Sequence, residues 1–406
     1  MNTGQGTMFR SLADDKDLAC VIGRHVAWLE RKPNGLQADL SKRDLSGYKL
    51  GGLRLEGIAF VAADLHDAQL TGSSLAKADL FGANLKGCDL RDADLSGAIL
   101  RGTTFFGARM DNANLSNADF RAGAIIQATD GEWEERNADL SECVLDYACL
   151  SHAQMQGANL AGSSLVGANL EGAILTGANL AGTDFSNANL EGADLSEASL
   201  ENSNFQRARL RGASLENAIA EGANFTGAKM SETILAGVDL SRCLLEDADI
   251  VISGSSLPAR FRRVLDEHEQ WIHSNGKDGR QGVLLDENLR FLDLSGRNLS
   301  AMVLRNACLE GADLTGCILV LTDLSNANLH RANLKSAHLY GTLLTGANLT
   351  EASLRDARFS PIDILRPDGT RTGRLQKPDL SNADLRGSDL TGADLTICSL
   401  TGALRD

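Results

Sequence analysis

The chain has 406 residues and a net charge of −15, and it contains 41 Gly, 5 Pro and only 4% aromatic residues. Its Leu content is too high for an intrinsically disordered chain, so this bias indicates an array of repeats. The acidic balance excludes ordinary nucleic-acid binding through a basic surface. The sequence has no apolar run long enough to span a membrane and its N-terminus does not resemble a secretory signal, so we expect a cytoplasmic protein with no membrane segment.

Residues 1–37 form the first predicted element, an N-terminal segment that contains an amphipathic helix. Apolar and aromatic residues recur in it at the i, i+3, i+4, i+7 spacing of one helical face. This face consists of Leu18, Val21, Ile22, His25, Trp28 and Leu29. We expect the helix to cover the open end of the structure that follows, with His25 and Trp28 in a structural role.

Residues 38–252 form the first predicted repeat region. An apolar residue, usually Leu or Phe, stands at every fifth position from Leu40 to Ile125, and the same phase resumes from Leu140 to Ile250. A period of five defines no single face of an α-helix, and in a strand it sends successive residues to opposite faces. The pattern is satisfied only if the chain turns a corner once in each unit, so that every Leu points to a common axis.

The other positions of the unit agree with this interpretation. Ala usually stands two residues before the Leu and points the same way on a short extended segment, while Asp, Asn, Ser and Gly favour the turns. The segments Ala83–Gly87, Ala168–Gly172 and Ala178–Gly182 resemble the pentapeptide-repeat family. This resemblance implies an all-β solenoid, a right-handed quadrilateral β-helix with four units in each coil.

Two insertions interrupt the repeats, and we predict that both are loops. The first loop, 126–137, contains Asp130, Glu132, Trp133, Glu134, Glu135 and Arg136, and the second, 360–378, contains Arg366, Asp368, Arg371 and Arg374. Loops on a rigid scaffold are the usual place for binding residues, so both are candidate interaction loops. The alternative is that both are tolerated surface insertions without a function.

Residues 253–288 are predicted to form a linker and a second amphipathic helix, and residues 289–406 a second repeat region. The second helix repeats the first at an offset of 243 residues, through Phe261, Val264, Leu265, His268, Trp271 and Ile272. We therefore expect a tandem duplication in which a capping helix precedes each of two β-helix modules. His268 and Trp271 then take the structural places of His25 and Trp28.

The sequence contains no motif of an enzyme site. It lacks a phosphate-binding Gly loop, a zinc-binding His pair and a G-x-S-x-G motif. The Asp residues of the repeats interchange with Asn, as structural turn residues do. Five of the eight Cys residues stand where the repeat otherwise has Ala, which indicates small buried side chains: Cys88, Cys143, Cys243, Cys317 and Cys398. We expect no catalytic residue, no metal and no cofactor.

The leading hypothesis is a non-enzymatic scaffold that binds an unidentified protein partner, with a C-terminal coil that also offers a surface for a homodimer. Residues 138–250 carry 16 acidic and 5 basic residues. Some members of the family imitate duplex DNA and protect gyrase, so a DNA-mimicking modulator of a type II topoisomerase, conferring drug or toxin resistance, is the alternative. The predicted spread of acidity over all four sides weakens it, as does the helix that divides the rod. A regulator of a separate enzyme chain is the third hypothesis.

Overall fold

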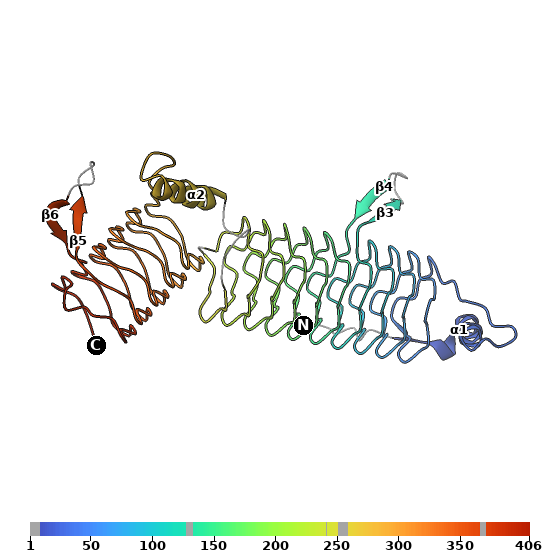
Figure 1. Ribbon diagram of the computed structural model, residues 1–406. Helices are drawn as coiled ribbons and strands as arrows, with labels where there is room; N and C mark the ends of the chain where they lie inside the picture. Colours follow the sequence, from blue (N-terminus) through green and yellow to red (C-terminus); the bar gives the residue numbers. More distant parts are fainter. Residues whose placement is uncertain (1–8, 127–132, 241, 251–258, 366–370) are drawn as a thin grey trace, which may run out of the picture. The chain divides into compact units, whose positions relative to one another are not determined.

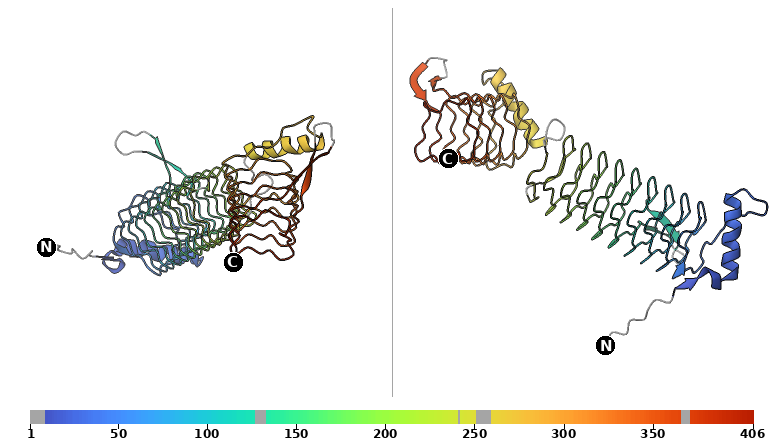
Figure 2. Two further views of the ribbon diagram at one scale, coloured as in Figure 1. Left: turned by 90° about the vertical axis from the view of Figure 1, so that its left-hand side faces the viewer. Right: turned by 90° about the horizontal axis from the view of Figure 1, so that it is seen from below.

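The computed structural model describes residues 9–126, 133–240, 242–250, 259–365 and 371–406. The chain divides into two compact units, unit 1 with residues 1–250 and unit 2 with residues 251–406. Each unit contains a stack of short coils, an α-helix and a two-stranded β-hairpin (Figures 1 and 2). The first residues of the predicted linker, 253–258, lie outside the described residues.

Hydrogen bonds between successive coils define the stack. Parallel bridges join residues that are 20 apart in sequence, as from Asp64 to Asn84 and from Asn84 to Thr104. The N–H of Leu65 donates to the carbonyl of Asn84 at 2.7 Å, and the N–H of Asn84 donates to the carbonyl of Ala63 at 2.9 Å. Each coil therefore contains four five-residue units, and every unit contributes one short extended segment.

The core of each stack lies on its axis and is filled in the five-residue phase. Leu160, Leu180 and Leu200 are fully buried. Three Phe side chains follow one another at the 20-residue spacing and stack in parallel, with ring centroids 4.9 Å apart between Phe185 and Phe205 and 5.0 Å apart between Phe205 and Phe225. A fully buried side chain of this size contributes about 1.5–3 kcal/mol to stability. The core is thus a continuous column rather than a set of separate clusters.

The small inward position accepts Cys, Ser and Thr because their polar atoms have backbone partners. The Sγ atoms of Cys88 and Cys317 donate to the carbonyls of Leu65 and Leu294, both at 2.8 Å. Burial raises the pKa of Cys317 to about 12, so the thiol stays protonated. Of the five Cys residues predicted at this position, four are buried and Cys398 is half-buried.

In unit 1, a short N-terminal segment and a helix lie on the first coil. Strand β1 (Arg10–Ser11) pairs in parallel with β2 (Tyr48–Lys49) on the edge of this coil, and a 3-10 turn, η1 (Leu12–Asp14), leads into α1 (Lys16–Leu29). Asp15 is the N-cap of α1, accepts from the N–H of Leu18 and also accepts from the Tyr48 hydroxyl at 3.1 Å. One carboxylate therefore both begins the helix and ties it to the coil.

In unit 2, α2 (Ala259–His273) has the equivalent place. Phe261 and Leu265 of the helix belong to the same buried cluster as Leu284, Leu289 and the rest of the coil core. The chain then passes very close to the helix backbone: an added Cβ on Gly279 would lie 2.2 Å from the carbonyl oxygen of Glu267. The equivalent residue of unit 1, Gly35, would place a Cβ 2.4 Å from the backbone nitrogen of Trp28. Glycine is required at both places because only hydrogen fits there.

The two insertions are β-hairpins, so the prediction of loops is wrong in form. Strands β3 (Gly123–Ile126) and β4 (Trp133–Arg136) pair antiparallel in unit 1, as do β5 (Ile362–Leu365) and β6 (Arg371–Gln376) in unit 2. Backbone groups that leave the coil have no coil to pair with, so they pair with each other. The prediction that Ile125 ends the first run of repeats is also wrong, since Ile125 lies in β3 opposite Glu134.

The coil continues across each hairpin without a change of face. Thr104 bridges Asp139 and Leu343 bridges Asp379, so these pairs are 35 and 36 residues apart in sequence instead of 20. The surplus of 15 and 16 residues corresponds to segments 122–136 and 361–376, each of which is the hairpin with the one residue that precedes it. Each hairpin is therefore an addition to an unbroken coil, and it projects from the stack of its own unit (Figures 1 and 2).

Candidate interaction surfaces

The hairpin of unit 1 is fixed to the coil by the last residue of β4. The Nε atom of Arg136 donates to the carbonyl oxygen of Gly102 at 2.9 Å, and its Nη2 atom donates to that of Gly82 at 3.4 Å. Glu134 and Glu135 are exposed on the same strand. The structure thus brings four of the six predicted loop residues together on β4, where Trp133 pairs with Ile126. Asp130 and Glu132 lie outside the described residues.

The hairpin of unit 2 is fixed by an equivalent contact. The Nε2 atom of Gln376 donates to the carbonyl oxygen of Gly341 at 2.6 Å. Gln376 stands three residues before the returning coil residue Asp379, as Arg136 stands three residues before Asp139. Of the predicted residues of the second loop, Arg371 and Arg374 lie in β6. Arg366 and Asp368 lie outside the described residues.

An apolar surface lies under the base of the first hairpin. Phe81, Val61 and Ile99 point outward from three successive coils and line a shallow pocket of about 370 Å³ with Asp79, Arg101 and Asp119. Gly123, the first residue of β3, is so close to this surface that an added Cβ would lie 3.0 Å from Cε2 of Phe81. The hairpin therefore rises directly beside an exposed patch that combines an aromatic ring with charged groups.

Asp119 holds two arginines beside this patch. Its carboxylate accepts from Nε of Arg101 at 2.6 Å and from Nε and Nη2 of Arg121, both at 2.9 Å. Burial opposes ionisation, but the hydrogen bonds from Arg121 and Arg101 outweigh it and lower the pKa of Asp119 to about 2. The carboxylate is therefore charged at neutral pH, and the two guanidinium groups are held in fixed positions beside the hairpin.

Apolar side chains also surround the base of the second hairpin. Ile362, the first residue of β5, lies so close to Gly341 that an added Cβ there would be 2.6 Å from its Cγ2, and Leu321 lies 3.0 Å from the same point. His338 and Tyr340 stack with ring centroids 5.6 Å apart on the preceding coil. Each unit therefore presents a hairpin with apolar and aromatic groups at its base.

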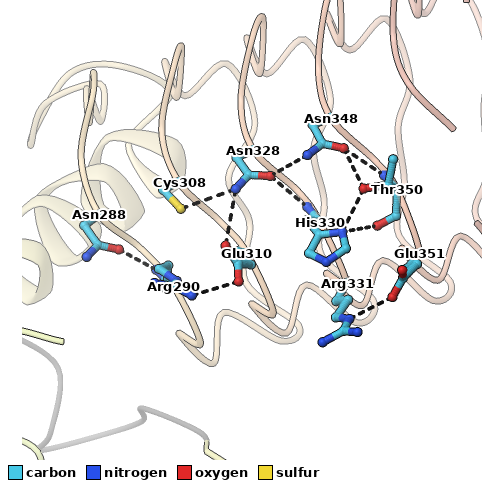
Figure 3. A network of polar contacts seen from close by, with 10 residues as sticks. All are labelled: Asn288, Arg290, Cys308, Glu310, Asn328, His330, Arg331, Asn348, Thr350 and Glu351. Atoms are coloured by element: carbon cyan, nitrogen blue, oxygen red, sulfur yellow. Dashed lines mark hydrogen bonds and ion pairs between the residues drawn. The ribbon is translucent and has the colours of Figure 1, made fainter. Parts of the chain in front are cut away.

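A ladder of polar side chains that the sequence analysis did not identify crosses one face of unit 2 (Figure 3). Arg290 donates to Glu310 at 2.8 Å, Asn328 donates to Glu310 at 3.4 Å, and Asn348 donates to Oδ1 of Asn328 at 3.0 Å. A comparison of residues 20 apart would have found it, because amide and charged residues recur on this face. Such bonds satisfy outward polar groups and join four coils.

The same ladder contains a thiol and an imidazole, but their contacts are structural. Cys308 is the acceptor of a long contact, 3.7 Å, from Nδ2 of Asn328. The Nδ1 atom of His330 contacts two atoms of Thr350, the side-chain Oγ1 at 2.7 Å and the backbone carbonyl oxygen at 2.9 Å. Among the residues drawn in Figure 3, His330 is thus directed at Thr350 rather than at Cys308. A nucleophile needs its base within hydrogen-bond reach, and the ladder has no such pair.

The two histidines predicted to lie beneath the helices are fully enclosed. His25 and His268 are 0% and 1% exposed. Their Nδ1 atoms accept from the backbone N–H groups of Ala38 at 3.1 Å and Gly282 at 3.0 Å. Each ring stacks on the Trp of its own helix, with centroids 5.5 Å apart for Trp28 and 5.7 Å apart for Trp271. These four residues form two equivalent contacts between helix and coil.

Burial lowers the pKa of both imidazoles. For His25 the carboxylate of Glu56 opposes this effect without overcoming it, and for His268 burial is the one cause. The neutral form is therefore favoured, which agrees with an Nδ1 atom that accepts a hydrogen bond. The described residues contain no group of three or more His, Cys, Asp or Glu placed to hold a metal ion. Within the same ranges, no helix has the length and hydropathy needed to cross a membrane.

A family model described as pentapeptide repeats matches more than half of the chain, at residues 49–87, 78–121, 136–162, 153–192, 178–217, 208–247, 288–319, 322–360 and 374–404. The chain belongs to the pentapeptide-repeat family. Members of this family fold as right-handed β-helix solenoids, and the coil stacks of both units are of this kind. The predicted family is confirmed, and the predicted fold class is confirmed as a right-handed β-helix solenoid. A search of curated proteins found no match.

Three solved structures illustrate the likeness to other pentapeptide-repeat proteins. HetL, a pentapeptide-repeat protein involved in heterocyst differentiation regulation from the cyanobacterium Nostoc sp. strain PCC 7120, is 29% identical over 57% of this chain and 94% of its own, with a TM-score of 0.34. A protein from the thylakoid lumen of Arabidopsis thaliana is 27% identical over 32% of this chain and 64% of its own, with a TM-score of 0.16. A trypsin-treated form of QnrB1, a plasmid-mediated fluoroquinolone resistance protein, is 19% identical over 49% of this chain and 94% of its own, with a TM-score of 0.28.

The buried histidines predict a loss of stability in mild acid. Because their pKa values are lowered in the folded state, the unfolded chain binds protons more readily, and stability falls as the pH decreases below the ordinary value of 6.5. Thermal melts at pH 7.5 and pH 5 should show a lower Tm at pH 5. In the double variant His25→Asn and His268→Asn, which keeps an acceptor near the Nδ1 position, this difference should shrink. An unchanged difference would show that other groups cause it.

Proposed function

We propose that the protein is a non-enzymatic scaffold that binds a protein partner through its two hairpins and the coil surface at the base of each. In this proposal each coil has four sides, and the two helices act as caps on the first coils. The cytoplasm is the proposed compartment, because all eight cysteines are free thiols and burial raises the pKa of several of them.

The observation that carries the proposal is the equivalent attachment of the two hairpins. Arg136 and Gln376 occupy the same place relative to the returning coil, and each donates to the carbonyl oxygen of a Gly in the preceding coil. An anchored hairpin loses less conformational entropy when it binds, since its base is already ordered.

The surface beside the first hairpin has the composition of an interaction site. Aromatic residues and Arg are enriched at protein interfaces, and this patch offers Phe81, Arg101 and Arg121 together. Asp119 holds both guanidinium groups in place, so a partner would meet a fixed pattern of charge. The exposed Glu134 and Glu135 add acidic groups on the hairpin itself.

The DNA-mimicking alternative depends on the acidic segment 138–250. Several acidic groups of this segment are paired with arginines of the same segment: Glu191 with Arg209 at 2.8 Å, Glu232 with Arg211 at 2.8 Å, and Glu221 with Arg242. These pairs place positive charge among the carboxylates, unlike the uniform phosphate charge of a duplex. We therefore rank this alternative below the scaffold.

Removal of the hairpins tests the scaffold proposal without breaking the coil. Deletion of 122–136 joins Arg121 to Asn137 and restores an ordinary five-residue unit, and deletion of 361–376 joins Ser360 to Lys377 in the same way. Each deletion should leave the far-UV circular dichroism of the coil unchanged. A partner captured by the full chain should be lost from one or both deletions, with its affinity reduced roughly tenfold or more. If both deletions bind as well as the full chain, the hairpins are not the binding elements.

We also propose a homodimer through the last coil of unit 2, since Leu390, Ile397 and Leu400 are only partly buried there. Light scattering should give twice the monomer mass for the full chain. Leu390→Glu should restore the monomer because it places a charge in the interface, whereas Leu375→Glu, at a position 65% exposed on β6, should not. A monomer mass for the unaltered chain would contradict the proposal.

A further inference from the structure

The contact between helix and first coil occurs twice in this protein, which allows equivalent residues to be compared. The hydrogen bond from Ala38 to His25 corresponds to that from Gly282 to His268. These bonds align the helices at an offset of 243 residues and the first coils at an offset of 244. Any difference between the two sites is therefore a difference in side chains rather than in register.

The two sites differ at the wall between helix and coil. In unit 1 this wall contains Val26 of α1 and Leu53 of the coil, which are both half-buried. The equivalent residues of unit 2 are Glu269 on α2 and Arg297 on the coil. An apolar pair in one unit is thus a pair of opposite charges in the other.

A second difference in side chains occurs at the same helix–coil junction. Arg54 and Glu30 form an ion pair of 3.5 Å across the helix–coil junction of unit 1. Their equivalents in unit 2 are Asn298 and His273, which form no ion pair with each other. The ion pair at this edge of the unit 1 junction therefore has no equivalent in unit 2, where α2 and the coil are instead joined by Arg260 and Glu287, 2.9 Å apart.

The result is a groove of about 560 Å³ between α2 and the first coil of unit 2. Its apolar residues are Leu265, Leu299 and Ile272, of which the first two are buried. Its polar residues are Glu269, His273, Ser295, Arg297 and Asn298. Within the described part of the chain, the side chains of Glu269 and Arg297 have neither a hydrogen bond nor an ion pair, although both line this one groove.

We propose that this groove binds a free amino acid with an apolar side chain. The Arg297 guanidinium binds the α-carboxylate, because its planar fork matches the two oxygens. The Glu269 carboxylate on the opposite wall binds the α-ammonium group. The side chain lies on the apolar floor of Leu265, Ile272 and Leu299. The volume falls in the range of roughly 300–1,000 Å³ that is typical of small-molecule sites.

The opposite charges of Arg297 and Glu269 favour an amino acid over a ligand that carries only a carboxylate or only an amine. A plain carboxylate would gain the contact with Arg297 but would be repelled by Glu269, and a plain amine would meet the reverse situation. A ligand that carries both charges on one carbon satisfies both walls at once. This site lies apart from both hairpins, so it does not depend on the scaffold proposal.

Isothermal titration with L-leucine, using the full chain, tests the proposal. L-Leucine should bind, whereas N-acetyl-L-leucine, which lacks the ammonium group, and L-leucinamide, which lacks the carboxylate, should each bind roughly tenfold more weakly or worse, since each loses one hydrogen-bonded contact with a charged group. Glu269→Val and Arg297→Leu, which copy the residues of unit 1, should each weaken L-leucine binding by a similar factor. Arg358→Leu, at an exposed position of the coil away from the groove, should leave it unchanged.

Three results would overturn the proposal. One is the absence of binding at about 10 mM L-leucine, a concentration that would reveal even a millimolar site. Another is binding that survives both Glu269→Val and Arg297→Leu. The third is equal binding of N-acetyl-L-leucine, which would show that Glu269 contacts no ammonium group. Thermal melts of each variant should match that of the unaltered chain, since both substitutions reproduce a junction that already exists in unit 1.

Discussion

The backbone hydrogen bonds between one coil and the next are the interaction on which the rest of the structure depends. They occur at a spacing of 20 residues along both stacks, and each of the four units of a coil contributes to them. Because the spacing is fixed, one Leu follows another on the axis, and Phe185, Phe205 and Phe225 stack face to face. The same spacing lets a hairpin leave the coil and return to the same face, as between Thr104 and Asp139.

The 20-residue spacing also couples the corners of neighbouring coils. Tyr147 and Gly167 both turn a corner with positive φ, at 59° and 66°. The Tyr147 side chain lies over the next corner, where an added Cβ on Gly167 would be 2.7 Å from its ring. His152 lies over Gly172 in the same way, at 2.5 Å. Glycine at a corner thus leaves room for a side chain of the preceding coil that leans onto it, a relation between residues 20 apart that a unit-by-unit examination of the sequence does not reveal.

The sequence predicted the features that depend on short-range periodicity. The five-residue phase identified the inward residues of the runs, such as Leu170, and the family. The i, i+3, i+4, i+7 spacing identified two helices that contain His25 and His268. These patterns are sufficient because burial in the core leaves few alternatives for an apolar residue that recurs so regularly.

The features that the sequence did not predict depend on contacts between distant residues. The insertions were predicted as loops, although their sequences contain Asp130-Gly131 and Asp368-Gly369, and Asp-Gly is a dipeptide that favours hairpin turns. The anchors Arg136 to Gly102 and Gln376 to Gly341 were not predicted, because the insertions were expected to be loops and no insertion residue was placed against the coil. The groove beside α2 was not predicted, because it depends on which residues of α2 face which residues of the coil.

A deletion of whole or partial coils tests most directly whether the 20-residue spacing governs the structure. Removal of 161–180 takes out one complete coil and joins Leu160 to Ala181 in phase. We expect this variant to unfold cooperatively, with its far-UV circular dichroism per residue unchanged. Removal of 161–182, two residues more, shifts the inward Leu residues out of phase, and we expect it to lose both the cooperative transition and the β signal. Equal stability of the two variants would contradict the account.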